Sequence, residues 1–369
     1  MKILQVTSYF DPHLGGIERH VQRLSDRLSD EGHDVTILTT NIPRTKKDER
    51  MGKLEILRFE APLRPMGNPL AIGMLRGLLS KRDFNIVHSH DEHAFTSNLA
   101  ALAHHLGNQH LVISCHGSLA YTNPFEKGML SVYEKTLMLA TLRSAEAVIS
   151  LSESDRHHLR ALGVNQERIS VIPNAIDLPT RITTLNKRPN EEVILCVSQL
   201  LQRKGIETLV EAMQEVHEAH RNAKLLIVGE GERKVELLKM RRQRGLEEVI
   251  VLKGRISEGE LEEAYGACDL LVLPSFAEGM PTVILEAMAR GKPVVATDIP
   301  GIREHFSETA ILVPPGEPHK LSETIVKVMD DEQLRSRLGS EGRRLVESRF
   351  TWDIVVRQIV DLYRRVLGP

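Results

Sequence analysis

Two glutamates eight residues apart, Glu278 and Glu286, could bind a ligand that carries several hydroxyl groups. An apolar run at 270–273 precedes them, and apolar residues at helical spacing follow Pro281. This pattern predicts Glu278 on the turn after a strand and Glu286 about two turns inside the next helix. Ligands bind at such turns in open α/β sheets, and a carboxylate accepts neighbouring hydroxyl groups. Paired glutamates are more often a solvated helix face, but the strand–turn–helix context favours a sugar or ribose site.

Basic residues and glycines follow other predicted strands. Arg203 and Lys204 follow the first strand of the C-terminal half and lead into a helix, a position that suits a diphosphate. A solvated charged turn is the ordinary alternative. Gly15 and Gly16 open the first helix and Gly229 follows another strand, so that the backbone could approach a phosphate or nucleotide there. None has the spacing of a dinucleotide-binding fingerprint, so they indicate no cofactor.

One histidine stands at a comparable position. His116 precedes Gly117 at the end of an apolar run and could hydrogen-bond a ligand hydroxyl or orient a reacting group. His88, His90 and His93 are too loosely grouped to predict a metal site, and each is more typical of a core or solvated histidine. The chain has no Asp-x-Asp pair for Mg²⁺ or Mn²⁺, no P-loop and no nucleophile elbow. We therefore expect no metal site and no kinase, ATPase or hydrolase chemistry.

Composition places the chain among globular proteins of two domains. Its 369 residues exceed one ordinary core, and its net charge of −2 comes without the basic stripe of a nucleic-acid-binding protein. Three isolated cysteines, Cys115, Cys196 and Cys268, lie in apolar runs, which predicts buried thiols in a reducing compartment. The chain starts directly with a strand pattern, so we expect no signal peptide, and its apolar runs are shorter than the about 20 residues of a membrane span. A cytoplasmic location is expected.

Strand and helix patterns alternate in two series, which the polar segment 178–192 separates. Such alternation predicts two Rossmann-like, doubly wound α/β domains that face each other across a cleft. The expected domains are 1–180 and 190–350, followed by an amphipathic helix in 351–369. Strands are predicted at 2–7, 35–38, 54–59, 85–88, 110–114, 147–150, 193–197, 225–228, 249–252, 270–273 and 291–296.

These motifs also occur in an order that points to one family. The motifs are residues 15–18, 116–117, 173–177, 204–205, 229–231 and 278–294. The set resembles the retaining, two-domain (GT-B) glycosyltransferases of family four, also called glycosyl transferases group one, over essentially the whole chain. The resemblance implies a nucleotide-diphospho-sugar donor held mainly by the second domain, 190–350, and an acceptor on the side of the first domain, 1–180. It also implies no cofactor and a C-terminal helix that returns to the first domain.

The resemblance further implies a role for each candidate residue. Glu278 would contact the sugar hydroxyls, Glu286 the ribose and Lys204 the diphosphate, while the Gly16 region would approach the diphosphate and His116 would lie beside the sugar. His116, Lys204 and Glu278 form the expected catalytic set. The expected donor-binding set is Gly15, Gly16, Gln199, Arg203, Lys204, Gly229, Glu278, Gly279, Met280, Pro281, Thr282 and Glu286.

Three positions depart from the family pattern. Gln199 stands where the family usually has an arginine that contacts the phosphates, which shifts leaving-group stabilisation toward Lys204 and Arg203. Ala175 and Pro300 each replace a glycine that is usual in the family, and we expect these changes to alter loops only.

The expected function is metal-independent transfer of a hexosyl group to an acceptor hydroxyl, with retention of the anomeric configuration. A nucleotide-sugar 2-epimerase, which needs no acceptor, and a non-catalytic sugar-nucleotide binder are the alternatives. The nucleotide, the sugar and the acceptor, whether a sugar, a glycolipid or another hydroxyl, stay open. The segment 64–82 combines apolar and basic residues and could rest on the anionic inner face of a membrane, although a helix packed on the sheet is the more ordinary explanation.

Overall fold

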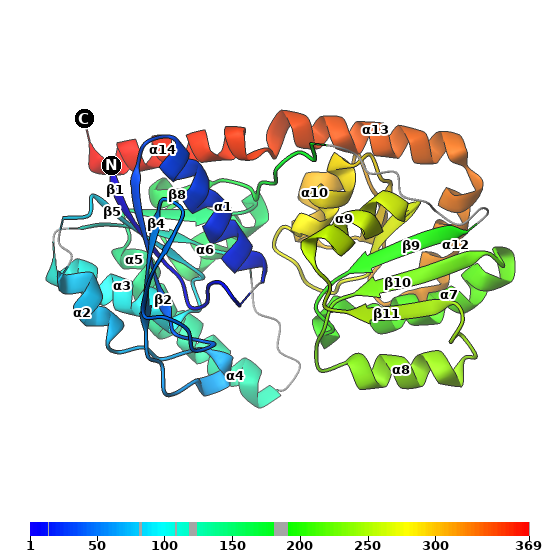
Figure 1. Ribbon diagram of the computed structural model, residues 1–369, viewed down its shortest axis with the longest axis horizontal. Helices are drawn as coiled ribbons and strands as arrows, with labels where there is room; N and C mark the ends of the chain where they lie inside the picture. The colour runs from blue at the N-terminus through cyan, green and yellow to red at the C-terminus, as the bar shows by residue number, and fades with distance from the viewer. Residues whose placement is uncertain (14, 81–82, 108, 118–123, 181–190, 369) are drawn as a thin grey trace. The chain divides into compact units, whose positions relative to one another are not determined.

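The computed structural model describes residues 1–13, 15–80, 83–107, 109–117, 124–180 and 191–368. These form two compact units, 1–175 together with 352–369, and 176–351 (Figure 1). Each unit is an α/β domain with its own sheet, which confirms the predicted doubly wound fold class.

The first unit contains an eight-stranded sheet in the order β3-β4-β2-β1-β5-β6-β7-β8. All neighbouring strands are parallel except β3, which pairs antiparallel with β4. The strands are β1 (Lys2–Val6), β2 (Asp34–Thr40), β3 (Asp48–Met51), β4 (Leu54–Phe59), β5 (Ile86–His90), β6 (His110–Ser114), β7 (Ala147–Ser150) and β8 (Ile169–Val171). The helices are α1 (Gly16–Asp30), η1 (Pro65–Gly67), α2 (Met74–Ser80), α3 (Phe95–Leu106), α4 (Pro124–Tyr133), η2 (Glu134–Met138), α5 (Leu139–Ser144), α6 (Glu153–Leu162), η3 (Gln166–Arg168) and α14 (Trp352–Leu367).

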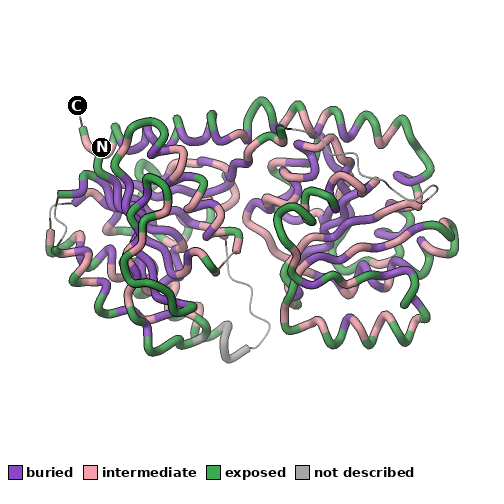
Figure 2. Tube along the Cα trace, viewed as in Figure 1, coloured by how far each residue is buried: buried purple, intermediate pink, exposed green. Residues whose placement is uncertain are grey.

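Helices cover both faces of this sheet because its strands are apolar on both sides. Ile3 of β1 packs toward α1 and α14, whereas its neighbour Leu4 packs toward α2, α3, α5 and α6. Successive residues of a strand point to opposite faces, so both are buried completely. Figure 2 shows the strands largely in purple, whereas the helices around them mix buried, intermediate and exposed positions.

The second unit contains a parallel six-stranded sheet in the order β11-β10-β9-β12-β13-β14. The strands are β9 (Glu192–Val197), β10 (Ala223–Val228), β11 (Ile250–Gly254), β12 (Leu270–Leu273), β13 (Val294–Thr297) and β14 (Ile311–Val313). The helices are η4 (Gln202–Lys204), α7 (Ile206–Ala219), α8 (Lys234–Gln243), α9 (Glu258–Ala267), α10 (Thr282–Ala289), α11 (Pro300–Phe306), α12 (Pro318–Asp330) and α13 (Glu332–Arg349). Helices α7, α8 and α12 share one apolar core with this sheet.

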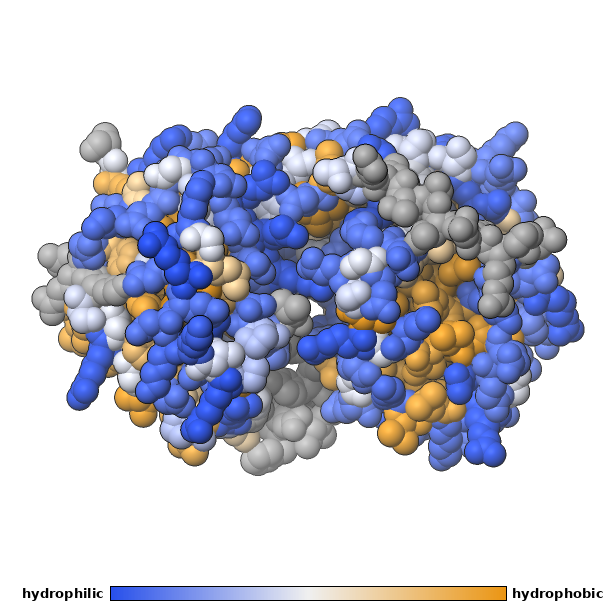
Figure 3. Space-filling view, in the orientation of Figure 1, coloured by the Kyte–Doolittle hydropathy of each residue, from blue (hydrophilic) through white to orange (hydrophobic). Residues whose placement is uncertain are grey.

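The edge strand β11 is less covered than the central strands. Figure 3 shows hydrophobic surface over β10, β11 and α8, where Val251 and Val235 are exposed. All residues of the central strand β12 are buried, by contrast.

Chain order reverses at one point in each sheet, between β1 and β5 and between β9 and β12. The strands on either side of such a point send their following loops in opposite directions, which leaves a crevice outside their carboxyl ends where ligands bind. The loops after these four strands are therefore where a site is expected in each unit.

Several sequence predictions concern these elements. Every predicted strand is present, and all three cysteines are buried. Glu286 lies only about one turn inside its helix, because α10 begins at Thr282, so the predicted depth of two turns was wrong. Residues 181–190 of the predicted linker lie outside the described residues.

The segment 64–82 packs several of its apolar residues into the first unit but leaves Ile72 66% exposed. Ala71, Met74 and Leu78 are buried, while Arg64 and Arg76 are exposed, and residues 81–82 lie outside the described residues. Within the described ranges, no helix is both long and apolar enough to cross a membrane.

Candidate active site

Lys204 and Glu278 meet at the point where the chain order reverses in the second sheet. Lys204 ends η4 after β9, and Glu278 lies on the loop after β12. Lys204 Nζ donates a hydrogen bond to Glu278 Oε1 at 2.6 Å, and Ser275 Oγ donates to the same oxygen at 2.7 Å. The two charged side chains are only 13% and 8% exposed, so water screens their attraction weakly. The structure thus joins the residue predicted to bind the diphosphate, Lys204, and the residue predicted to bind the sugar, Glu278, in one ion pair.

Both donors converge on one oxygen of Glu278. The other carboxylate oxygen, Oε2, makes no hydrogen bond with any described residue. A carboxylate oxygen has two lone pairs, so Oε2 is available to accept a ligand hydroxyl while Oε1 holds Lys204.

The loops that carry Lys204 and Glu278 pack closely against two glycines, Gly229 and Gly301. A Cβ added at Gly301 in α11 would lie 1.9 Å from the carbonyl oxygen of Gly279 and 2.3 Å from that of Glu278. A Cβ added at Gly229 would lie 1.9 Å from the carbonyl oxygen of Ser198, and its φ of +141° also favours glycine. Gly229, predicted to approach a nucleotide, therefore has a packing role against the loop after β9.

Glu286 is held by a residue that sequence reasoning did not identify. Tyr265, from α9, donates its hydroxyl to Glu286 Oε2 at 2.5 Å. Burial, together with the charge of Glu286, raises the pKa of Tyr265 well above its usual value, so the phenol remains a donor. The Arg290 guanidinium lies 4.9 Å from the centre of the Tyr265 ring. This arrangement fixes one oxygen of Glu286 and leaves Oε1 without a hydrogen bond to any described residue.

The remaining predicted donor-binding residues lie on the same loops. Gln199 is exposed after β9, and its side chain makes no hydrogen bond with the described residues. Arg203 is half-buried, and its carbonyl accepts the N–H of Phe276 at 2.8 Å, which ties the loops after β9 and β12 together. Gly279, Met280, Pro281 and Thr282 lead from Glu278 into α10, with Met280 and Pro281 buried.

In the first unit, His116 lies on the loop after β6, beside the point where the chain order reverses. It is half-buried, and its backbone N–H donates to Glu92 Oε2 at 3.0 Å. Burial lowers the pKa of His116 to about 4, although the charges of Asp91 and Glu18 oppose this shift. The imidazole is therefore neutral at neutral pH. Gly15 is the N-cap of α1, which begins at Gly16.

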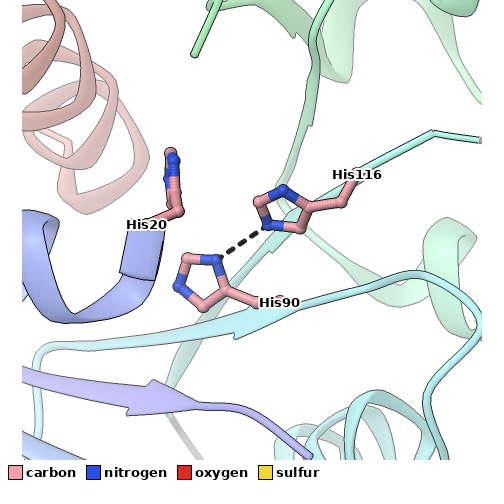
Figure 4. A group of neighbouring side chains, drawn as sticks. All are labelled: His20, His90 and His116. Atoms are coloured by element: carbon pink, nitrogen blue, oxygen red, sulfur yellow. Dashed lines mark hydrogen bonds between the residues drawn. The ribbon is translucent and has the colours of Figure 1, made fainter. Parts of the chain in front are cut away.

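His116 belongs to a cluster of histidines that the sequence prediction missed. Figure 4 shows His20 on α1, His90 at the end of β5 and His116 lying together. His90 Nδ1 and His116 Nε2 are 3.2 Å apart, and the rings of His20 and His116 lie 5.1 Å apart between centres. His88, His90 and His93 are all buried, so of the two alternatives for each, a core or a solvated histidine, the structure shows the core one. Their tight grouping was not anticipated.

Two sets of side chains bring possible metal ligands within 4.8 Å of one another, His20 with His90 and His116, and Asp91 with Glu92 and His93. In the first set, His90 and His116 direct their facing nitrogens at each other in a hydrogen bond. In the second, His93 faces Asp91 at 3.7 Å and Glu92 at 3.7 Å. Within the described part of the chain, the Nδ1 atoms of His20 and His93 are buried and make no hydrogen bond.

Comparisons with known proteins identify the family of this chain. Residues 14–179 match the model of Glycosyltransferase Family 4, and residues 180–345 match that of Glycosyl transferases group 1. The chain belongs to the group 1 glycosyltransferases. A phosphatidylinositol N-acetylglucosaminyltransferase subunit of Homo sapiens is 27% identical to this glycosyltransferase, over 99% of this chain and 76% of that protein.

Solved structures show the same GT-B fold. Sucrose-phosphate synthase from Thermosynechococcus elongatus aligns with a TM-score of 0.83 at 23% identity, over 99% of this chain and 98% of that chain. Anabaena HepE in complex with UDP-glucose aligns with a TM-score of 0.78 at 21% identity, over 98% of each chain. The fold of this glycosyltransferase is therefore shared along nearly its whole length.

The glycosyltransferase assembles some predicted site residues directly and others only through partners. Lys204 and Glu278 bind each other, while Glu286 is bound through Tyr265 and His116 through His90. Tyr265 and His90 carry no local signal, because each lies in a different strand or helix from the residue it binds.

Proposed function

We propose that this glycosyltransferase moves a hexosyl group from a nucleotide-diphospho-sugar to an acceptor hydroxyl, with retention of configuration and without a metal ion. The observation that carries the proposal is the nearly buried Lys204–Glu278 pair at the carboxyl ends of β9 and β12. A cation and a hydroxyl-binding carboxylate held side by side suit the bond between a sugar and a diphosphate.

In the proposed mechanism, Glu278 accepts hydroxyl groups of the sugar, and Lys204 stabilises the charge that develops on the leaving diphosphate. Glu286 binds the ribose through the oxygen that Tyr265 leaves available. The acceptor oxygen attacks the anomeric carbon on the face from which the phosphate departs. The leaving phosphate oxygen takes the proton of the acceptor hydroxyl, so that no covalent enzyme intermediate is needed.

The named activities of relatives support a nucleotide-sugar donor. The human relative is a phosphatidylinositol N-acetylglucosaminyltransferase subunit, and the HepE structure contains UDP-glucose. Neither relative identifies the nucleotide or the acceptor that this chain uses. The acceptor we propose is a sugar, a glycolipid or another hydroxyl compound. Peripheral membrane contact through 64–82 stays a prediction that co-sedimentation with anionic vesicles would test.

The decisive experiment combines binding with product analysis. UDP-, GDP- and ADP-sugars are titrated against the full chain, and nucleotide release is followed with and without candidate acceptors, in the presence and absence of EDTA. We expect one nucleotide series to bind and acceptor-dependent release that EDTA leaves unchanged. Sugar epimerised at C2 without an acceptor would indicate a 2-epimerase, and binding without any turnover would indicate a non-catalytic binder.

Replacing Tyr265 by phenylalanine removes the hydrogen bond to Glu286 while keeping the ring under Arg290. We expect the KM for the donor to rise about fivefold with kcat nearly unchanged, because one hydrogen bond to the ribose-binding carboxylate contributes about 1 kcal/mol. Steady-state kinetics at varied donor concentration measure both constants. A large fall in kcat with unchanged KM would contradict a ribose-binding role for Glu286.

A further inference from the structure

A chain of hydrogen bonds connects His116 with the buried interior of the first unit. His116 Nε2 faces His90 Nδ1 at 3.2 Å, and His90 Nε2 faces Gln5 Oε1 at 2.7 Å. The Gln5 amide nitrogen donates to the Tyr363 hydroxyl at 3.5 Å, and that hydroxyl lies 2.6 Å from His88 Nδ1. We call this chain the histidine relay; its members are His116, His90, Gln5, Tyr363, His88 and Ser114.

The relay has a direction, which its acceptors determine. The carbonyl oxygen of Gln5 can only accept, so the proton of His90 must be on Nε2. Burial lowers the pKa of His90 well below its ordinary value, so the ring carries one proton and its Nδ1 is an acceptor. His116 must then donate its Nε2–H to His90. Beyond Gln5, the Tyr363 hydroxyl accepts a hydrogen bond from the Gln5 amide and donates one to His88. These hydrogen bonds therefore run in the same direction as those from His116 to His90 and from His90 to Gln5.

This direction leaves the second nitrogen of His116 as an acceptor. Nδ1 of His116 makes no hydrogen bond with the described residues, and Figure 4 shows it pointing away from His90. A neutral imidazole whose Nε2 is protonated has a lone pair on Nδ1 and can receive a hydroxyl proton there.

We propose that His90 is a positioning residue that holds His116 in the Nε2–H tautomer, so that His116 Nδ1 accepts a hydrogen bond from a hydroxyl group of the hexosyl substrate. The substrate contact rests on the proposed function, whereas the tautomer follows from the relay alone. His90 itself is fully buried, so it acts on a ligand only through His116.

The tautomer is tested without any substrate, by ¹⁵N NMR of the imidazole nitrogens in the full chain. The signals that disappear in His116→Asn identify His116. We expect its Nε2 to be protonated and its Nδ1 unprotonated in the wild-type protein, and a mixture of tautomers in His90→Phe. A protonated Nδ1 in the wild-type protein would overturn the proposal, whatever the protein transfers.

Kinetics then test whether the tautomer matters for transfer. His90→Phe should lower kcat about tenfold, the rate equivalent of one well-placed hydrogen bond, with the KM for the donor nearly unchanged. His90→Asn places an amide oxygen near the position of Nδ1 and should recover most of this loss. Thermal unfolding establishes that each variant is folded.

His20 provides the matched control, because its ring also packs against His116 but no hydrogen bond joins the two among the described residues. We expect His20→Phe to keep kcat within about twofold, less than the effect of one hydrogen bond. An equal loss in His20→Phe and His90→Phe would show that packing rather than the relay sets the activity. Full activity in His90→Phe would show that the relay plays no part in transfer. Absence of transfer in the wild-type protein would instead contradict the proposed function and leave the NMR result standing.

Discussion

Replacing Lys204 by alanine or methionine should lower kcat for sugar transfer by about 10²- to 10³-fold, the usual loss when one preorganised charge-stabilising group is removed. Lys204 is the cation that the structure places beside Glu278, and its ammonium group is only slightly exposed. In a nearly buried position, a positive charge stabilises a developing diphosphate far more than it would in water. The measurement is single-turnover release of nucleotide from the donor that binds most tightly.

The same change removes the countercharge of Glu278, so stability must be measured beside activity. Glu278 keeps its hydrogen bond from Ser275, but a nearly buried carboxylate without a cation destabilises the fold. Glu278→Ala is expected to lower transfer at least tenfold as well, because the sugar loses its hydroxyl acceptor.

A surface lysine serves as the control for this prediction. Lys234 pairs with Glu230 at 2.7 Å, and the two side chains are 40% and 42% exposed. Lys234→Ala should change neither stability nor kcat appreciably, since exposed pairs contribute little. Near-normal turnover in folded Lys204→Ala and Glu278→Ala would contradict the assigned roles.

The central features of this site were predictable because their signals are local. Glu278 and Lys204 each follow an apolar strand within a few residues, and parallel strands place their following loops at one edge of a sheet. The sequence does not say which strands are neighbours. The pairing of β9 with β12 comes from the sheet order, and it brings Lys204 to Glu278 across 74 residues of chain.

The residues that bind Glu286 and His116 were missed because their contacts depend on which strands and helices are neighbours. Tyr265 reads as an ordinary buried aromatic residue of α9, and only its distance to Glu286 reveals its role. His90 and His116 lie on neighbouring strand ends, 26 residues apart in sequence, so their contact depends on the pairing of β5 with β6.

Short edge elements were the weakest part of the fold prediction. Strands β8 and β14 have three residues each, too few to show an apolar alternation, and β3 is a polar strand at the sheet edge. The depth of Glu286 was overestimated although the pattern already placed the helix after Pro281, because the step from Thr282 to Glu286 makes only about one turn at 3.6 residues per turn.

The second prediction with a large expected effect concerns Gly301, which has no side chain. Gly301→Ala should lower kcat/KM by about 10²-fold, because a displacement of about 1 Å at a reacting centre costs that much. The new Cβ would collide with the backbone carbonyl oxygens of Glu278 and Gly279, which cannot rotate away as a side chain would. The loop that carries Glu278 must therefore move relative to Lys204.

Two comparisons separate this displacement from a general loss of stability. Gly259 lies in α9 with nothing within 4 Å of an added Cβ, so Gly259→Ala should keep full activity and raise the free energy of unfolding by about 0.5–1 kcal/mol. In a Glu278→Ala background, Gly301→Ala should have little further effect on kcat, since residues that act as a unit are not additive. A second, independent loss of the same size would mean that Gly301 acts on the enzyme by a route other than the position of Glu278.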